Sequence, residues 1–280
     1  MVRNEADIIE AFVRHNLAQV DALTVVDHAS VDGTTQILAA LAGEGLPLEL
    51  EREDGLAQRQ SEVLTRASRA AFASGADAVV PLDADEFLRV HARAAFERLL
   101  QTLPDDVDGV LAWQTYVPQP DAMPGTHPLQ RARRRLASER HGLGKVVLAR
   151  GFMRTPAAVI GPGNHTVLRF GADQDPRVRP IRLARIPPEI AAVAHLPVRS
   201  AMQLMHKVRV GWLAHRAALR SNPDLAFHWR ELAAEFERTG VPAPARVADI
   251  AANYGLPMTA WRPAAEIATL TGDQYEGRFT

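Results

Sequence analysis

Strand-like and helical segments alternate along the first 115 residues of this chain, and this alternation limits the folds open to it. The strand-like segments are short and rich in Val, Leu and Ala, and amphipathic segments with apolar residues three and four apart separate them. We predict strands at residues 22–27, 46–52, 78–82 and 109–115, and helices after an Asn4 cap and at residues 34–42, 58–74 and 93–101. Short connections between such elements favour an α/β fold with a mostly parallel central sheet and helices on both faces.

The second half of the chain has a different pattern. Prolines are frequent between residues 117 and 130 and predict a long loop there. Short strands are predicted at residues 146–148, 166–170 and 191–194. The pattern then becomes helical, with Ser200 as the first cap and Gly240 as the end of a second helix. We therefore divide the chain into a sheet-containing domain, residues 1–200, and a helical C-terminal extension, residues 201–280.

The composition excludes several classes of protein. The chain contains no Cys, which rules out disulfides, thiolate catalysis and zinc sites built from cysteine. No apolar run approaches the ~20 residues that span a bilayer, and the charged start does not read as an export signal, so we expect a cytoplasmic protein. A formal net charge of −1 and an aromatic content of 6% are untypical of a nucleic-acid-binding protein.

An acidic run, Asp83-Ala84-Asp85-Glu86, directly follows the predicted strand 78–82. In an open α/β sheet, ligands bind at the carboxyl ends of the strands. Three neighbouring carboxylates repel one another, and a hard divalent cation supplies the missing counter-charge and holds the oxygens of a diphosphate. The alternative is structural, because Asp85 and Glu86 would also be favourable at the N-terminus of a following helix.

A second acidic motif ends the predicted strand 22–27. Asp27 closes the strand, Ser30 to Gly33 form a turn that includes Asp32, and Thr34 begins a helix. One interpretation is a capped strand–turn–helix connection without further function. The other is that Asp27 accepts hydrogen bonds from a nucleobase or ribose at the same edge of the sheet.

Taken together, these motifs resemble the GT-A glycosyltransferases, and most closely bacterial proteins related to glycosyltransferase family two. The resemblance lies in Arg3-Asn4-Glu5, DHASVDGT (27–34) and LDADEF (82–87), and it is best over residues 1–100. It is weaker in GPGNHTV (161–167) and HLPVRSAMQLMHK (195–207). It implies that residues 1–200 bind a UDP- or GDP-linked sugar, which is transferred to an acceptor hydroxyl with inversion of the anomeric centre.

The resemblance also implies roles for particular residues. The substrate-binding residues would be Asn4, Glu5, Asp27, Asp32, Asp83, Arg199 and Lys207. The metal ligands would be Asp83, Asp85 and His195, and they would hold Mn²⁺ or Mg²⁺. Arg199 and Lys207 would neutralise the leaving diphosphate, and Asp85 would be a catalytic residue through the metal.

The general base is where the sequence departs from the family pattern. Family-two enzymes commonly place it with a Glu-Asp pair after the D-x-D motif, and this chain has no clear pair of that kind. His165, in a glycine-rich loop, is our substitute for the catalytic base. Asp173, Asp175 and Glu189 remain candidates.

The resemblance does not name the acceptor, which would be a glycan, a lipid-linked group or a protein. We expect it to lie under the proline-rich loop 117–130 and the helical C-terminal part. The arginine run Arg131–Arg135 is typical of a solvated surface. Alternatively, it contacts acidic lipids at the inner face of the membrane or an anionic acceptor.

Two other functions remain open. A nucleotidyltransferase would use a similar sheet and metal, but it usually begins with a glycine-rich phosphate loop that this chain does not show. A catalytically degenerate nucleotide-sugar-binding protein would keep the fold without turnover, because fold does not imply function.

Overall fold

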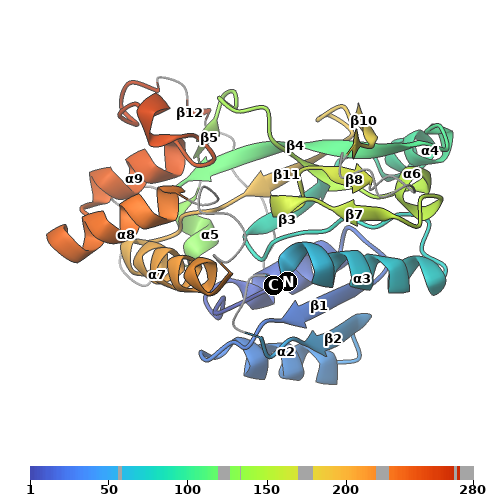
Figure 1. Ribbon diagram of the computed structural model, residues 1–280, viewed down its shortest axis with the longest axis horizontal. Helices are drawn as coiled ribbons and strands as arrows, with labels where there is room; N and C mark the ends of the chain where they lie inside the picture. Colours follow the sequence, from blue (N-terminus) through green and yellow to red (C-terminus); the bar gives the residue numbers. More distant parts are fainter. Residues whose placement is uncertain are drawn as a thin grey trace.

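The computed structural model describes residues 1–55, 59–118, 127–132, 134–169, 179–218, 227–267 and 270–271. Its α-helices are α1 (Ile9–Leu17), α2 (Thr34–Gly43), α3 (Gln60–Ala73), α4 (Arg93–Thr102), α5 (Pro128–Arg131), α6 (Arg150–Met153), α7 (Ala201–Ala218), α8 (Phe227–Thr239) and α9 (Pro244–Ala252), with 3-10 turns η1 (Pro162–Asn164) and η2 (Met258–Ala260). Its strands are β1 (Leu23–Asp27), β2 (Leu48–Arg52), β3 (Glu86–Val90), β4 (Val107–Val117), β5 (Arg134–Leu136), β6 (Gly144–Val147), β7 (Ala158–Ile160), β8 (Val167–Arg169), β9 (Arg179–Pro180), β10 (Arg182–Arg185), β11 (Ala191–His195) and β12 (Leu270–Thr271). The predicted α/β class is confirmed (Figure 1).

The strands form three sheets, of which the largest has the order β12-β5-β4-β11-β3, with β6 and β10 also paired to β4. β1 and β2 form a parallel pair, and Val2 extends it through an isolated parallel bridge to Asp27. Val2 is thus the single residue before α1 that pairs with this sheet. A third, antiparallel sheet contains β7, β8 and β9.

The prediction of a mostly parallel sheet is wrong in detail, because the central sheet is mixed. β10 and β11 run parallel to β4, whereas β3, β5 and β6 join it or β11 in antiparallel fashion. The predicted strand 78–82 is also absent from the described sheets, apart from a bridge between Val79 and Leu148. Pro81 lacks the N–H that a ladder needs, so the chain instead turns at Asp83–Asp85 and β3 begins at Glu86.

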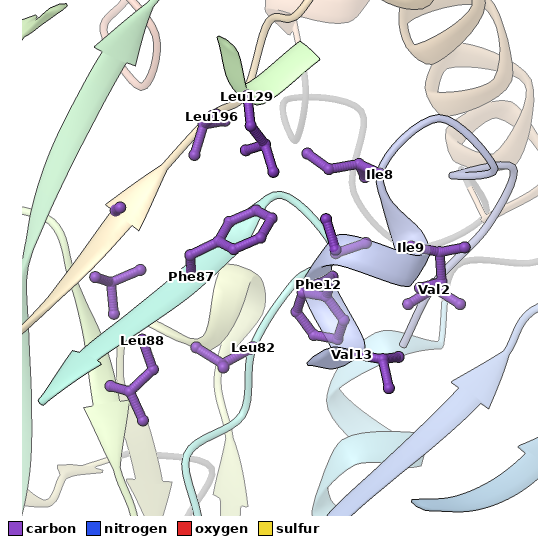
Figure 2. Packing of buried hydrophobic residues seen from close by; sticks show 14 of the residues in the cluster. Val2, Ile8, Ile9, Phe12, Val13, Leu82, Phe87, Leu88, Leu129 and Leu196 are labelled. Atoms are coloured by element: carbon purple, nitrogen blue, oxygen red, sulfur yellow. The ribbon is translucent and has the colours of Figure 1, made fainter. Parts of the chain in front are cut away.

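The main core lies between α1 and the central sheet (Figure 2). Phe12 of α1 packs edge-on against Phe87 of β3, with 6.2 Å between the ring centres. Ile9 and Val13 are buried with Phe12, which confirms the apolar stripe expected of this helix. Asn4 does not cap the helix as predicted: α1 begins at Ile9, and the Asn4 side chain instead accepts a hydrogen bond from Val31 N–H.

A second core joins the C-terminal helices to the end of the central sheet, where Figure 1 shows α7, α8 and α9 gathered together. Leu204 of α7 and Ile250 of α9 pack there with Val117 of β4. The Ser200 hydroxyl accepts a hydrogen bond from Gln203 N–H at 3.1 Å, so the predicted cap of α7 is confirmed. Among the described helices, none is long and apolar enough to cross a membrane.

Candidate functional site

The sheet register brings the acidic turn and the end of β11 together. Glu86, the first residue of β3, pairs with His195, the last residue of β11. Leu196 N–H then donates to the carbonyl of Asp85 at 2.8 Å, which ties the turn to the chain leaving β11. α7 starts at Ala201 and returns Lys207 to the same turn. Residues far apart in sequence therefore meet at one end of the central sheet.

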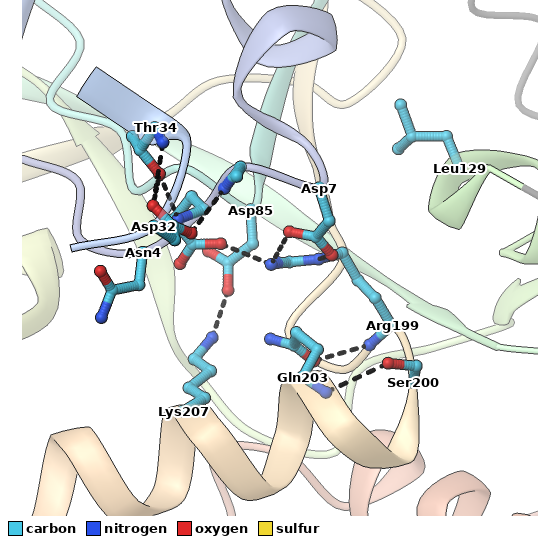
Figure 3. Close-up of polar contacts among 12 residues, drawn as sticks. Asn4, Asp7, Asp32, Thr34, Asp85, Leu129, Arg199, Ser200, Gln203 and Lys207 are labelled. Atoms are coloured by element: carbon cyan, nitrogen blue, oxygen red, sulfur yellow. Dashed lines mark hydrogen bonds and ion pairs between the residues drawn. The ribbon is translucent and has the colours of Figure 1, made fainter. Parts of the chain in front are cut away.

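Asp85 and Lys207 form an ion pair, with Nζ on the Oδ2 oxygen (Figure 3). The Asp85 side chain is 6% exposed and that of Lys207 is 22% exposed. Burial alone would raise the pKa of Asp85, but the charge of Lys207, with a smaller contribution from Arg199, lowers that pKa below its ordinary value. Burial would lower the pKa of Lys207, and Asp85 more than reverses this effect. Both groups are therefore charged.

Asp83 and Glu86 share a second cation, the fully buried Lys145. Lys145 Nζ lies 3.1 Å from Asp83 Oδ2 and 2.8 Å from Glu86 Oε2, and it also donates to the carbonyl of Gly163 at 3.0 Å. Burial raises the pKa of Glu86 despite the opposing charge of Lys145. The other Glu86 oxygen accepts from Trp113 Nε1 at 2.9 Å, so the turn is fixed to β4.

His195 is buried against the indole of Trp113. The two rings stack with centres 4.1 Å apart and planes at 18°. Burial lowers the pKa of His195 to about 3, even though the charge of Asp85 opposes the change, so the imidazole is neutral near pH 7. Its Nδ1 atom is buried and has no hydrogen-bond partner among the described residues. A neutral imidazole beside a carboxylate is a donor set that suits Mn²⁺ and related ions.

The predicted metal site is nevertheless not assembled as a three-residue centre. Within the described ranges, no group of three or more His, Asp or Glu side chains is arranged to hold a metal ion. Instead, Asp83 is paired with Lys145 and Asp85 with Lys207. Mg²⁺-type sites commonly use one or two protein ligands together with substrate phosphates. The buried Asp85 carboxylate and the unpartnered His195 nitrogen fit a site of that second kind.

Arg199 brings the N-terminal loop to this cluster. Its side chain is 1% exposed, and it donates to both oxygens of Asp7, from Nε at 2.9 Å and from Nη2 at 2.8 Å. Nη2 also forms an ion pair with Glu5, whose pKa is raised by burial and held down in part by Arg199. Nη1 is buried and without a hydrogen-bond partner in the described part of the chain. Glu5 and Arg199, both predicted to bind substrate, are thus neighbours of Asp85. Asp7 also belongs to this cluster, although it was not among the site residues predicted from the sequence.

The other predicted residues of the first two loops hold these loops to one another. Asn4 has a positive φ of 57°, and its N–H donates to Ser30 Oγ at 3.0 Å. Asp32 accepts from the N–H groups of Ala6 and Thr34 at 3.1 and 2.9 Å. The predicted turn after β1 is therefore an anchored connection, with Asn4 and Asp32 as its polar links.

Asp27 has a similar structural use. Its two oxygens accept from Ser30 N–H in the loop at 3.1 Å and from the Thr35 hydroxyl in the first turn of α2 at 2.6 Å. These bonds place Asp27 in the connection between β1 and α2, in agreement with the structural interpretation of the motif. Its contact with a nucleoside stays a prediction.

His165 also contacts Trp113, edge-on, with 4.7 Å between ring centres. Its Nδ1 donates to the carbonyl of Gly144 at 2.8 Å, and burial lowers its pKa, so the lone pair of the neutral ring is on Nε2. The preceding Gly163 has a φ of +66°, and a Cβ atom there would lie 2.6 Å from this Nε2. Glycine at position 163 therefore allows the positive φ of the loop and leaves room for the His165 ring.

The remaining candidates for the base fall elsewhere. Glu189 is exposed in the connection before β11, whereas His195 is the last residue of that strand. Because a strand rises about 3.3 Å per residue, the length of β11 separates the two residues. Asp173 and Asp175 lie outside the described residues. Most of the loop 117–130 does so too, and the arginine run 131–135 is described in part as strand β5.

Sequence reasoning missed Lys145 and Trp113 as parts of the site. One signal was available, because Lys145 and Lys207 are the only lysines in a chain whose other basic residues are arginine. Both lysines contact the acidic turn. Trp113 gave no such signal, since an apolar aromatic residue in a strand is usual.

No family model and no curated protein matches the chain. Among solved structures, it is similar to HddC from Yersinia pseudotuberculosis, with 10% identity and a TM-score of 0.31 over 67% of this chain and 80% of that one. It is also similar to the mannosyltransferase PcManGT from Pyrobaculum calidifontis in complex with GDP-Man and Mn²⁺, with 20% identity and a TM-score of 0.39 over 95% of this chain and 76% of that one. Because both TM-scores are below 0.5, the functional assignment rests on the residues of the site.

Proposed function

We propose that this protein is a glycosyltransferase with a GT-A-like fold that moves a sugar from a nucleotide-diphosphate donor to an acceptor hydroxyl. The observation that carries the proposal is the meeting of Asp85, His195 and Lys207 at the turn before β3. An acid, a neutral imidazole and a cation together match what a diphosphate and its metal ion need. The family-two motifs in the sequence support the same assignment.

The donor would bind to residues 1–200, and the extension 201–280 would add α7 with Lys207. The two interlocked loops that carry Asn4, Glu5, Asp27 and Asp32 would border the nucleoside. Arg199 and Lys207 would neutralise the negative charge that develops on the leaving diphosphate. The buried, unpartnered Nη1 of Arg199 supports this role, because a guanidinium N–H without an acceptor is costly.

A divalent cation, Mn²⁺ or Mg²⁺, would be held by Asp85 and His195, with Asp83 on the same turn. When bound, the ion supplies positive charge to the diphosphate. Sugar transfer itself requires that the acceptor oxygen forms a bond to the anomeric carbon while the bond to the diphosphate oxygen breaks. We expect a single displacement with inversion, as the resemblance implies.

His165 would be the general base. Its Nδ1–H is committed to the carbonyl of Gly144, which leaves Nε2 to accept the proton of the acceptor hydroxyl. Its lowered pKa keeps the ring neutral and able to do so at neutral pH. The acceptor would be a glycan, a lipid-linked group or a protein near residues 117–130 and the C-terminal helices, in the cytoplasm or at the inner face of the membrane.

Thermal unfolding with UDP, GDP and CDP, each with and without Mn²⁺, tests the proposal. One diphosphate together with Mn²⁺ should raise the melting temperature, because a ligand that binds only the folded state stabilises it. Asp85→Asn should abolish this rise, and the exposed Asp54→Asn should preserve it. A chain that responds to none of the diphosphates would contradict the proposal.

One observation favours a second function, a binding protein without turnover. Both acids of the D-x-D motif are paired with lysine rather than open to a metal ion. Incubation with the sugar nucleotide of whichever base binds separates the two functions. Release of free nucleotide diphosphate supports the transferase, and tight binding without any release supports the binding protein.

A further inference from the structure

The Asp85–Lys207 pair raises the question of how a metal ion could reach Asp85. The ammonium is on Oδ2 of a carboxylate that is almost fully buried. It is also hydrogen bonded to the carbonyl of Pro197 at 3.2 Å and lies 5.3 Å from the centre of the Tyr254 ring. Lys207 is thus held in a specific place, and that place is the one from which Asp85 is neutralised.

A metal ion and this ammonium compete for the same carboxylate. An ion on the other oxygen of Asp85 would put a double positive charge one carboxylate width from the ammonium, with little water between them to screen the repulsion. The neutral, buried His195 beside Asp85 has a nitrogen without a hydrogen-bond partner among the described residues, which could bind a metal ion. The negative charge of Asp85 that such an ion needs is already balanced by Lys207. The ammonium of Lys207 is therefore the cation that this carboxylate already holds.

The Lys207 ammonium can move away from Asp85 and still remain within the site. Lysine has a flexible four-carbon stem, and the Lys207 side chain is 22% exposed, unlike Lys145, which is fully buried. A diphosphate at the turn offers the ammonium a new anionic partner. The diphosphate would draw the ammonium away from Asp85, which opens this carboxylate to the metal ion. The metal ion on Asp85 would in turn favour the ammonium on the diphosphate.

We propose that Lys207 makes metal binding conditional on the donor: its ammonium occupies Asp85 in the donor-free protein and transfers to the diphosphate when the donor binds, which releases Asp85 to Mn²⁺ or Mg²⁺. The inference rests on the proposed function, since it needs a nucleotide diphosphate at this site. It assigns Lys207 a second task besides charge neutralisation. By linkage, the diphosphate must tighten metal binding by the same factor as the metal tightens diphosphate binding.

Titration of Mn²⁺, with free ion followed by electron paramagnetic resonance, measures this coupling. The wild-type protein should bind Mn²⁺ weakly alone and about 5- to 150-fold more tightly with the nucleotide diphosphate that binds best, the usual range of such coupling. Lys207→Met should bind Mn²⁺ alone at least about tenfold more tightly than the wild type and should lose most of the gain from nucleotide. Equal Mn²⁺ affinity of the wild type and Lys207→Met would overturn the inference.

Two further variants control the experiment. Arg209→Met removes the same charge from an exposed position of α7 and should behave as the wild type. The double variant Lys207→Met, Asp85→Asn should lose the new metal-only affinity; if it keeps that affinity, the ion is elsewhere and the inference is wrong. Should Lys207→Met not fold, the wild-type titrations still decide: Mn²⁺ bound as tightly without nucleotide as with it overturns the inference.

The two proposals fail in different ways. The comparison of the wild type with Lys207→Met in Mn²⁺ alone needs no nucleotide, so it tests the role of Lys207 by itself. Absence of any nucleotide-diphosphate binding, with or without metal, would instead overturn the proposed function.

Discussion

At the scale of single residues, Lys145 shows how closely the charges of the site depend on one another. Its ammonium is fully buried and satisfied by a carboxylate oxygen from each of Asp83 and Glu86 and by the carbonyl of Gly163. A buried ion pair is weak evidence of net stability, but removing one partner leaves an unpaired buried charge. Lys145 therefore stabilises the acidic turn in addition to being part of the site.

Lys145→Met should destabilise the fold by about 3–5 kcal/mol, the usual effect of breaking a buried pair. Urea unfolding measures the change. The double variant Lys145→Met, Asp83→Asn should recover part of the loss, because the amide removes the carboxylate charge that Lys145 balances. A single variant as stable as the wild type would show that the ion pair is not buried in solution.

The neutral, buried state of His195 predicts a pH dependence of stability. Its pKa is about 3 in the folded protein, below the ordinary value of 6.5, so the unfolded chain takes up a proton first as the pH falls. Stability from this group is complete above pH 6.5 and decreases toward pH 3, with a slope of up to about 1.4 kcal/mol per pH unit. His195→Gln should show a shallower loss of stability over this window in unfolding titrations. Parallel pH profiles for the two proteins would contradict the prediction.

Gly163 is the third residue for which the structure gives a sharp expectation. Gly163→Ala would put a Cβ atom 2.6 Å from Nε2 of His165 and would force a non-glycine residue to φ +66°. We expect a loss of about 1–2 kcal/mol from the backbone alone and a displaced His165. NMR titration of the imidazole and unfolding curves measure both effects. Gly142→Ala, where no atom lies within 4 Å of an added Cβ, is the matched control and should change neither.

At the scale of elements, local sequence patterns predicted helices better than they predicted strand pairing. Residues 34–42 and 93–101 are helices with nearly the predicted ends, and the Ser200 hydroxyl caps α7, because these signals act within a few residues. Residues 78–82 have the composition of a strand but not its hydrogen bonds, since pairing also needs a neighbour and Pro81 cannot donate. The prediction that the acids follow the carboxyl end of a strand is therefore wrong, because they lie in the turn at the amino end of β3.

At the scale of the whole molecule, the C-terminal helices complete the site from outside the sheet. α7 is held by Leu204 and Val208, which pack with Val117 of β4 and Ile250 of α9. Lys207 lies between these two anchors in sequence. The position of the ammonium therefore depends on how the helical extension packs on the sheet, and loss of this packing should affect the site.

Leu204→Ala tests this dependence. Leu204 is completely buried, so we expect a loss of about 2–5 kcal/mol from the cavity, measured by urea unfolding, and weaker binding of the nucleotide diphosphate. Leu213→Ala, on the same helix but 53% exposed, is the control and should change stability by less than about 0.5 kcal/mol. If binding stays unchanged in Leu204→Ala despite the lost stability, the site does not depend on the packing of α7.

The sequence alone determined which residues carry the acids and where helices α2, α4 and α7 begin, because helical periodicity, caps and turns are properties of neighbouring residues. It also indicated the α/β class. It did not determine which cation meets which acid: Lys145 is 62 residues from Asp83, and Lys207 is 122 residues from Asp85. Only the packing of β6 and α7 around the turn decides these pairings, because Coulomb attraction between buried charges depends on their separation in space and on the exclusion of water, and neither is encoded in a local pattern.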